Sequence, residues 1–66
     1  MNKKEELVKL YLNRSFKLEA LAHEAPTARR NAIYLNLARR EKEKATKVNE
    51  CRSKSLIDKL YKDDII

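Results

Sequence analysis

The sequence of 66 residues contains no glycine and no tryptophan, and it has one proline and one cysteine. Without glycine, the chain lacks the Gly-rich loops that bind phosphates and dinucleotides. The usual two-residue β-hairpin turns also depend on glycine. The only cysteine, Cys51, cannot form an internal disulfide. These absences exclude the nucleotide-binding motifs built on glycine and the small domains stabilised by internal disulfides.

Side chains that carry catalysis or bind metals are equally scarce. His23 and Cys51 are the only residues of their types, whereas a zinc site needs several such ligands. Asp63 and Asp64 are adjacent, but Ca²⁺ takes six or more oxygen ligands and no loop supplies them. We therefore expect a protein that is not an enzyme, with no cofactor, no metal and no small-molecule substrate.

Long apolar segments are also missing. No stretch approaches the ~18 apolar residues of a membrane span. The first six residues carry charges of both signs and no long apolar run follows them, unlike a secretory signal peptide. A lone thiol agrees with a reducing compartment. From these features we predict a soluble, cytoplasmic protein with no membrane partner.

The residues that are abundant favour helices. Leu, Ala, Lys, Glu and Arg dominate the sequence, and all five are strong helix formers. β-branched residues are few and do not alternate over the length of a strand. A chain of 66 residues makes one domain at most. We therefore predict that residues 1–66 form a single all-α domain.

One proline divides the chain into two helices. Pro26 lacks an N–H group and disfavours helical backbone at the preceding residue, so a helix predicted over residues 3–24 ends before it. The turn occupies residues 25–27, and Thr27 is the natural N-cap of a second helix over residues 28–50. Such a short connection makes the two helices antiparallel neighbours. The sequence thus predicts an antiparallel helical hairpin with a long second helix.

The apolar pattern changes direction after the charged middle of the second helix. At 100° per residue, the last apolar stripe is rotated by more than 90° from the earlier one. Either the chain breaks within residues 49–55 and a short third helix follows over 54–62, or one helix continues to the same end. We favour the break, with Ser53 or Ser55 as the cap of the third helix. The tail at residues 63–66 is expected to fray.

Both long helices are apolar over more of their girth than one partner helix can cover. In the first helix, an arc of about 120° holds the residues expected to pack: Leu7, Leu10, Tyr11, Leu18, Leu21, Ala22 and Ala25. In the second helix, the corresponding stripe holds four residues: Ile33, Tyr34, Leu37 and Ala38. Outside these stripes lie Leu12 and Phe16 of the first helix and a second stripe of the other helix: Ala28, Ala32 and Leu35.

These five residues are the predicted protein interface. They must meet a third helix, a second copy of the chain or another protein. Leu12 and Phe16 are the strongest candidates, because aromatic anchors carry much of the energy of interfaces. A hairpin of this length is half of a four-helix bundle, so we also expect a homodimer that forms a helical bundle.

One charge lies inside the packing arc of the first helix. Arg14 is expected to be paired, or to extend its charged end into water, because unpaired charges are rare on packing faces. Glu41 falls on the packing stripe of the second helix, and the two lie within roughly one helical turn, about 5 Å, when counted outward from the turn. We predict that Arg14 and Glu41 form an ion pair that fixes the register, within one chain or across a dimer.

The net charge of +6 is concentrated in the second helix. Residues 26–52 carry eight basic and three acidic side chains. Along one side of this helix we predict a basic ridge: Arg29, Asn36, Arg39, Arg40, Lys44 and Lys47. Such a ridge suits nucleic-acid phosphates or an acidic protein. The alternative is a solvated face stabilised by ordinary charge pairs along the helix.

The surplus apolar faces and the scarcity of chemical groups favour a regulatory or adaptor function. The leading hypothesis is a small inhibitor or anti-factor that binds and modulates another protein through its helical faces. The first alternative is an RNA- or DNA-binding regulator that uses the basic ridge. The second alternative is a structural subunit that self-assembles.

Overall fold

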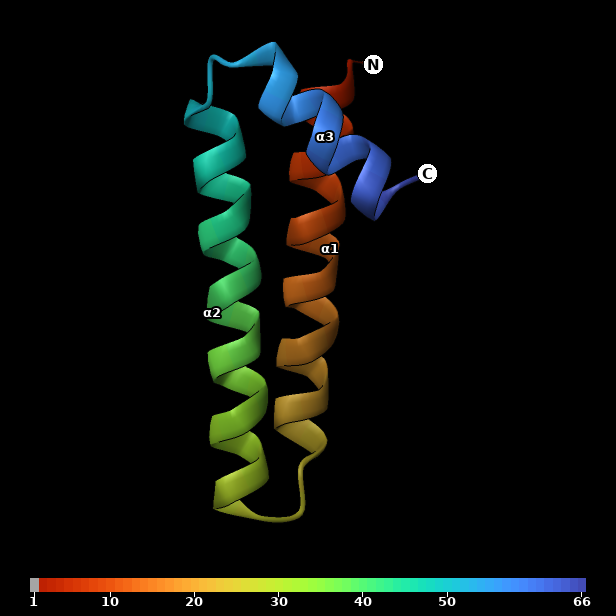
Figure 1. The fold of residues 1–66 in the computed structure, drawn as a ribbon. Coiled ribbons are helices and arrows are strands. Elements are labelled where there is room, and N and C mark those ends of the chain that lie inside the picture. Colours follow the sequence, from red (N-terminus) through yellow and green to blue (C-terminus); the bar gives the residue numbers. More distant parts are fainter. Residues whose placement is uncertain (1) are drawn as a thin grey trace.

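The computed structural model describes residues 2–66 and consists of three helices (Figure 1). Their bounds are Lys3–Glu24 for α1, Ala28–Glu50 for α2 and Lys54–Asp64 for α3. The first two helices form an antiparallel hairpin, and α3 crosses the N-terminal part of α1 (Figure 1). This confirms the predicted all-α fold and the helical hairpin. The predicted homodimer stays a prediction.

Each helix begins at a side chain that caps it. Asn2, Thr27 and Ser53 each accept a hydrogen bond from the backbone N–H three residues further along, at donor–acceptor distances of 2.8, 3.2 and 3.4 Å respectively. Such caps satisfy backbone donors that the first helical turn leaves open. Of the two serines predicted to begin the third helix, Ser53 is the cap and Ser55 lies inside the helix.

The chain breaks between α2 and α3, so the alternative of one continuous helix is wrong. Cys51 ends α2 with an extended backbone, and residues 51–53 are not helical. The third helix continues through Asp64 instead of ending near residue 62, so Asp63 and Asp64 do not belong to a frayed tail. The contact of Asp64 with α1, described below, accounts for the extra helical residues.

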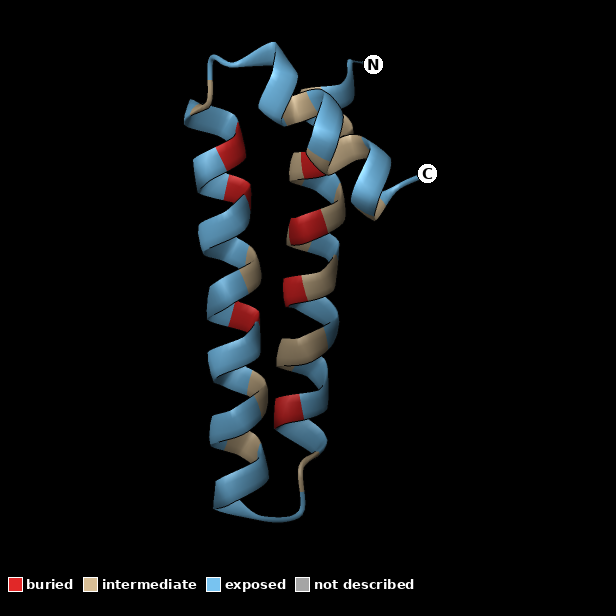
Figure 2. Cartoon of the chain, viewed as in Figure 1, coloured by how far each residue is buried: buried red, intermediate tan, exposed pale blue. Residues whose placement is uncertain are grey.

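The positions of α2 that contact α1 follow alternating steps of three and four residues. On α2 the buried or half-buried positions that face α1 are Asn31, Tyr34, Ala38, Glu41, Ala45 and Val48 (Figure 2). On α1 the fully buried positions are Leu7, Tyr11, Ser15 and Ala22. An average step near 3.5 residues keeps one seam of each helix against its partner when the two helices wind around each other.

Three residues predicted to pack in this seam lie outside it. Leu21, Ile33 and Leu37 are 45%, 49% and 39% exposed. The prediction grouped apolar residues on a straight helix with 3.6 residues per turn. The observed contact instead uses positions that recur every 3.5 residues on average, whatever residue occupies them. On α2 that spacing selects the small residues Ala38 and Ala45, which allow the helix axes to approach closely, and leaves larger apolar residues beside the seam.

The third helix packs mainly on α1 (Figure 1). Its apolar side is formed by Ile57, Leu60 and Tyr61, which lie against the core near the end of the hairpin opposite the turn. An ion pair of 3.1 Å between Lys3 Nζ and an oxygen of Asp58 adds to this contact. Because α3 is only 11 residues long and crosses the N-terminal part of α1, it covers part of one face of the hairpin and leaves the rest of the hairpin open (Figure 1).

Candidate functional site

An ion pair marks one face of the hairpin. Lys42 of α2 and Glu19 of α1 form this pair across the two helices. Leu12 precedes Glu19 by seven residues, and Leu35 precedes Lys42 by seven. Because seven residues make nearly two full turns, the members of each pair lie only about 20° apart around their helix. Leu12 and Leu35 therefore lie on the same face of the hairpin as the ion pair.

Ala28 lies with Leu35 on this face, whereas Phe16 and Ala32 lie at its two outer edges, about 60° from Glu19 and about 80° from Lys42 around their helices. We call this face the Phe16 face and define it by Leu12, Phe16, Ala28, Ala32 and Leu35. Phe16 is 57% exposed and Leu35 is 47% exposed. Ala28 and Ala32 are also exposed, whereas Leu12 is half-buried against the core. The five residues thus lie along one side of the hairpin, and their role as an interface stays a prediction.

The third helix lies on the opposite face. Lys3, which pairs with α3, is 13 residues from Phe16, so the two lie about 140° apart around α1. On α2, Lys44 lines a groove beside α3 and is nine residues from Leu35, which places these two about 180° apart. The folded chain therefore leaves the Phe16 face uncovered.

The predicted basic ridge is exposed along α2. Its six residues are all exposed to solvent: Arg29, Asn36, Arg39, Arg40, Lys44 and Lys47. Within residues 2–66, Lys44 alone among them has a carboxylate oxygen within 4.0 Å, that of Glu41 at 3.4 Å. The ammonium of Lys44 also lies 5.8 Å from the centroid of the Tyr11 ring. The other cations of the ridge remain available to an external anion.

The predicted ion pair between Arg14 and Glu41 is not formed within the described part of the chain. Both residues are half-buried beside Tyr11, but Glu41 pairs with Lys44 of its own helix. A spacing of three residues places Lys44 on the same side of α2 as Glu41, so Lys44 pairs with the Glu41 carboxylate in place of Arg14. The second oxygen of Glu41, Oε2, is buried without a hydrogen-bond partner. A contact across a dimer stays a prediction.

Tyr11 joins α1 to the end of α3. The side chain is 1% exposed, and its hydroxyl donates a hydrogen bond to Oδ2 of Asp64 at 2.5 Å. Burial first, and then the hydrogen bond and charge of Asp64, raise the pKa of Tyr11 above its ordinary value of 10.0. The two residues are 53 positions apart, so helical periodicity could not indicate this contact.

The raised pKa of Tyr11 predicts a loss of stability at alkaline pH. The folded state holds the phenolic proton of Tyr11 more tightly than the unfolded state does. The contribution of this proton to the free energy of unfolding is therefore complete below about pH 10 and is lost as the pH rises further. We expect the free energy of unfolding in urea to fall above about pH 10, by at most ~1.4 kcal/mol per pH unit from this group. Tyr11→Phe should remove that component, and the control Tyr34→Phe should retain it. Equal slopes in wild type and Tyr11→Phe would contradict the assignment.

The isolated chemical groups of the sequence do not come together. His23 is exposed in the last turn of α1, at the turn of the hairpin, and Cys51 follows α2 at the opposite end. Residues 2–66 contain no group of three or more His, Cys, Asp or Glu side chains that could hold a metal ion. None of the three helices in this part of the chain combines the length and the apolar character needed to cross a membrane.

Comparisons with known proteins give no relative from which a function could be transferred. No protein-family model matches the chain, and neither a curated protein nor a solved structure matches it. The function must therefore be argued from the surfaces that this fold leaves exposed, foremost the Phe16 face and the basic ridge.

Proposed function

We propose that this protein is a non-enzymatic regulator or adaptor that binds an amphipathic helix of another protein on the Phe16 face. The observation that supports this proposal is the exposure of Phe16 and Leu35 on the face that α3 leaves uncovered. Grouped apolar side chains at the surface mark interaction sites. Aromatic residues among them supply a large share of binding energy.

The shape and charge of this face favour a helical and acidic partner. Two antiparallel helices present a shallow groove in which a third helix can lie. The small side chains of Ala28 and Ala32 allow close approach beside Leu35. Arg39 is exposed and follows Leu35 by four residues, which places both on the same side of α2. The partner helix therefore carries apolar residues at steps of three and four, with acidic residues toward Arg39.

Capture of partners from the native host tests the proposal. The tagged wild-type chain should retain a protein partner after nuclease treatment. Phe16→Asp and Leu35→Asp should each weaken its binding at least ~30-fold, as expected for a residue worth about 2 kcal/mol at an interface. The helical circular dichroism of both variants should persist. Leu21→Asp is the matched control, because Leu21 is 45% exposed on the opposite face, and this variant should bind normally.

Two results would contradict the proposal. Loss of helical signal in both Phe16→Asp and Leu35→Asp would show that these side chains belong to the core. A wild-type dimer in sedimentation experiments that becomes a monomer in Phe16→Asp would assign the face to a second copy of the chain. The protein would then be a self-assembling subunit.

Nucleic-acid binding by the basic ridge is a second candidate function. It is supported by Arg29, Arg39, Arg40 and Lys47, which are exposed and have no carboxylate within 4.0 Å in residues 2–66. Affinity for duplex RNA or DNA, measured by fluorescence anisotropy, should fall steeply between about 50 and 200 mM salt. Arg29→Glu and Arg40→Glu should abolish it, whereas Phe16→Asp should not. Unchanged binding in the two reversals would exclude the ridge.

A further inference from the structure

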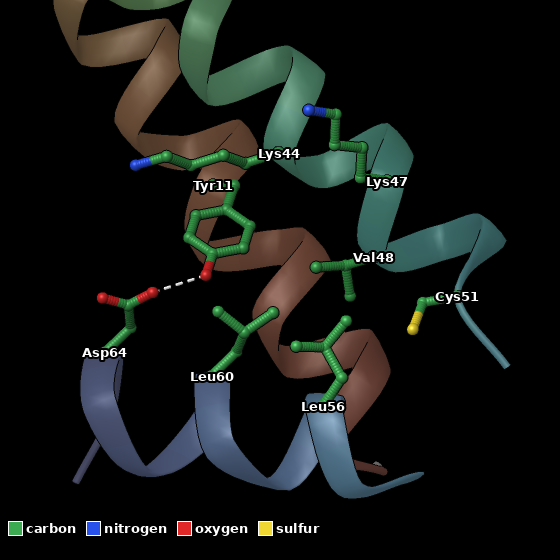
Figure 3. A pocket seen from close by; sticks show the side chains of 8 residues that line it. All are labelled: Tyr11, Lys44, Lys47, Val48, Cys51, Leu56, Leu60 and Asp64. Atoms are coloured by element: carbon green, nitrogen blue, oxygen red, sulfur yellow. Dashed lines mark hydrogen bonds between the residues drawn. The ribbon is translucent and has the colours of Figure 1, made fainter. Parts of the chain in front are cut away.

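A groove lies between α3 and the C-terminal end of α2, on the face opposite the Phe16 face. It exists because α3 leans on α1 and makes few contacts with α2 (Figure 1). Its volume is about 290 Å³. Figure 3 shows Val48 of α2 and the side chains of Leu56 and Leu60 of α3 pointing toward the same space. The chain thus forms a small recess that its own side chains do not fill.

The walls of this groove are mainly apolar. Val48 is buried and Leu60 is half-buried, whereas Leu56 is 47% exposed although it lines the recess. The ring of Tyr11 closes one end and the thiol of Cys51 lies at the other (Figure 3). An apolar occupant would remove the exposed surface of Leu56 from water, which is favourable in proportion to the area covered.

The charges around the groove differ between its two sides. Lys47 lines the groove at its α2 rim, is exposed and has no carboxylate within 4.0 Å in residues 2–66. Its ammonium points away from Leu56 and Leu60 in Figure 3. Lys44 is the second cation, but its ammonium is held by Glu41. Asp64 is the acid that lines the recess, and one of its oxygens already accepts the hydrogen bond from Tyr11. An anionic occupant would therefore pair with Lys47 once that exposed side chain turns toward the groove, and it would meet an occupied carboxylate at the far end.

We propose that this groove binds a free medium-chain fatty acid. The acyl chain lies between Val48, Leu56 and Leu60, and the carboxylate lies at the rim beside Lys47. The volume, about 290 Å³, is at the lower limit of small-molecule pockets, which begin at roughly 300 Å³, so it suits one short chain. This inference goes beyond the proposed function and concerns the other face of the molecule.

Titration of the full chain with octanoate, followed by amide shifts in two-dimensional NMR spectra, tests the proposal. Saturable shifts are expected at Val48, Cys51 and Leu56, whereas Phe16 and Leu35 should not move. Octylammonium, which has the same chain and the opposite charge, should bind about fivefold more weakly, as expected for an exposed charge interaction of ~1 kcal/mol. Equal binding of the two compounds, or no saturable shift, would overturn the proposal.

Two variants separate the charge from the apolar walls. Lys47→Gln should weaken octanoate binding about fivefold. Lys59→Gln, on an exposed position of α3 outside the groove, should leave it unchanged. Leu56→Asp should abolish binding while the helical circular dichroism persists, because Leu56 is already half-exposed. Unchanged affinity in Lys47→Gln, or in a folded Leu56→Asp, would contradict the proposed site.

The thiol of Cys51 gives an independent readout. Cys51 is half-buried at the groove and is the only cysteine of the chain. Octanoate at about three times its dissociation constant should slow alkylation of Cys51 by iodoacetamide about fourfold, because the free groove is then populated one quarter of the time. Alkylation at an unchanged rate while the NMR shifts saturate would place the ligand elsewhere and refute the proposal.

Discussion

Leu7→Ala is expected to lower the free energy of unfolding by about 3 kcal/mol. Leu7 is 0% exposed and packs with Tyr11, Ala45 and Val48 in the core cluster. Its replacement removes buried methyl groups and leaves a cavity that surrounding residues fill only partly. Single domains have roughly 0.05–0.15 kcal/mol of stability per residue, so this loss takes a large share of the total in so small a protein.

Urea unfolding followed by circular dichroism measures this effect. Leu35→Ala is the matched control, because it removes the same atoms from a side chain that is 47% exposed. We expect the control to cost less than about 1 kcal/mol, as is usual for surface substitutions. Equal losses in the two variants would mean that the Phe16 face is as well buried in solution as the core. That result would contradict both the packing described above and the proposed interface.

Ala45→Leu is expected to destabilise the protein by about 2 kcal/mol, for the opposite reason. Ala45 is 3% exposed in the contact between α1 and α2. A larger side chain at this position cannot be accommodated without moving the two helices apart or forcing neighbouring side chains out of their preferred rotamers. The same argument applies to Ala38, which is 2% exposed in the same seam.

Ala32→Leu provides the control for this substitution. Ala32 lies on the exposed side of the same helix, so the larger side chain has free space there. We expect a change within about 0.5 kcal/mol. If Ala45→Leu stabilised the protein in urea unfolding, the helices would have been separated by unfilled space, and the close approach attributed to the two buried alanines would be wrong.

The first and last residues of the helices could be predicted because residues next to them in the sequence determine where each helix begins and ends. Pro26 ends α1 through its own backbone, and Thr27 and Ser53 begin the next two helices with side chains that reach only three residues along the chain. None of these effects needs a distant partner. The predicted and observed bounds of α1 and α2 therefore agree closely, and the break before α3 was the favoured alternative.

The choice of packing face could be predicted only in part. Tyr34, Ala38 and Glu41 lie in the seam as expected, but Ile33 and Leu37 do not. Several faces of α2 carry apolar residues, so apolar character alone does not select one. The spacing of the positions that face α1 and the close approach that small residues allow decide the matter, and both depend on the pair of helices.

The sequence by itself determined that the chain is helical and where each long helix begins and ends. Tertiary structure alone decided the direction in which α3 folds back. Contacts between Tyr11 and Asp64 and between Lys3 and Asp58 join residues more than 50 positions apart, and no local pattern specifies them. Because α3 settles on α1 on the side away from Phe16, the same arrangement leaves the Phe16 face open and creates the groove at Lys47.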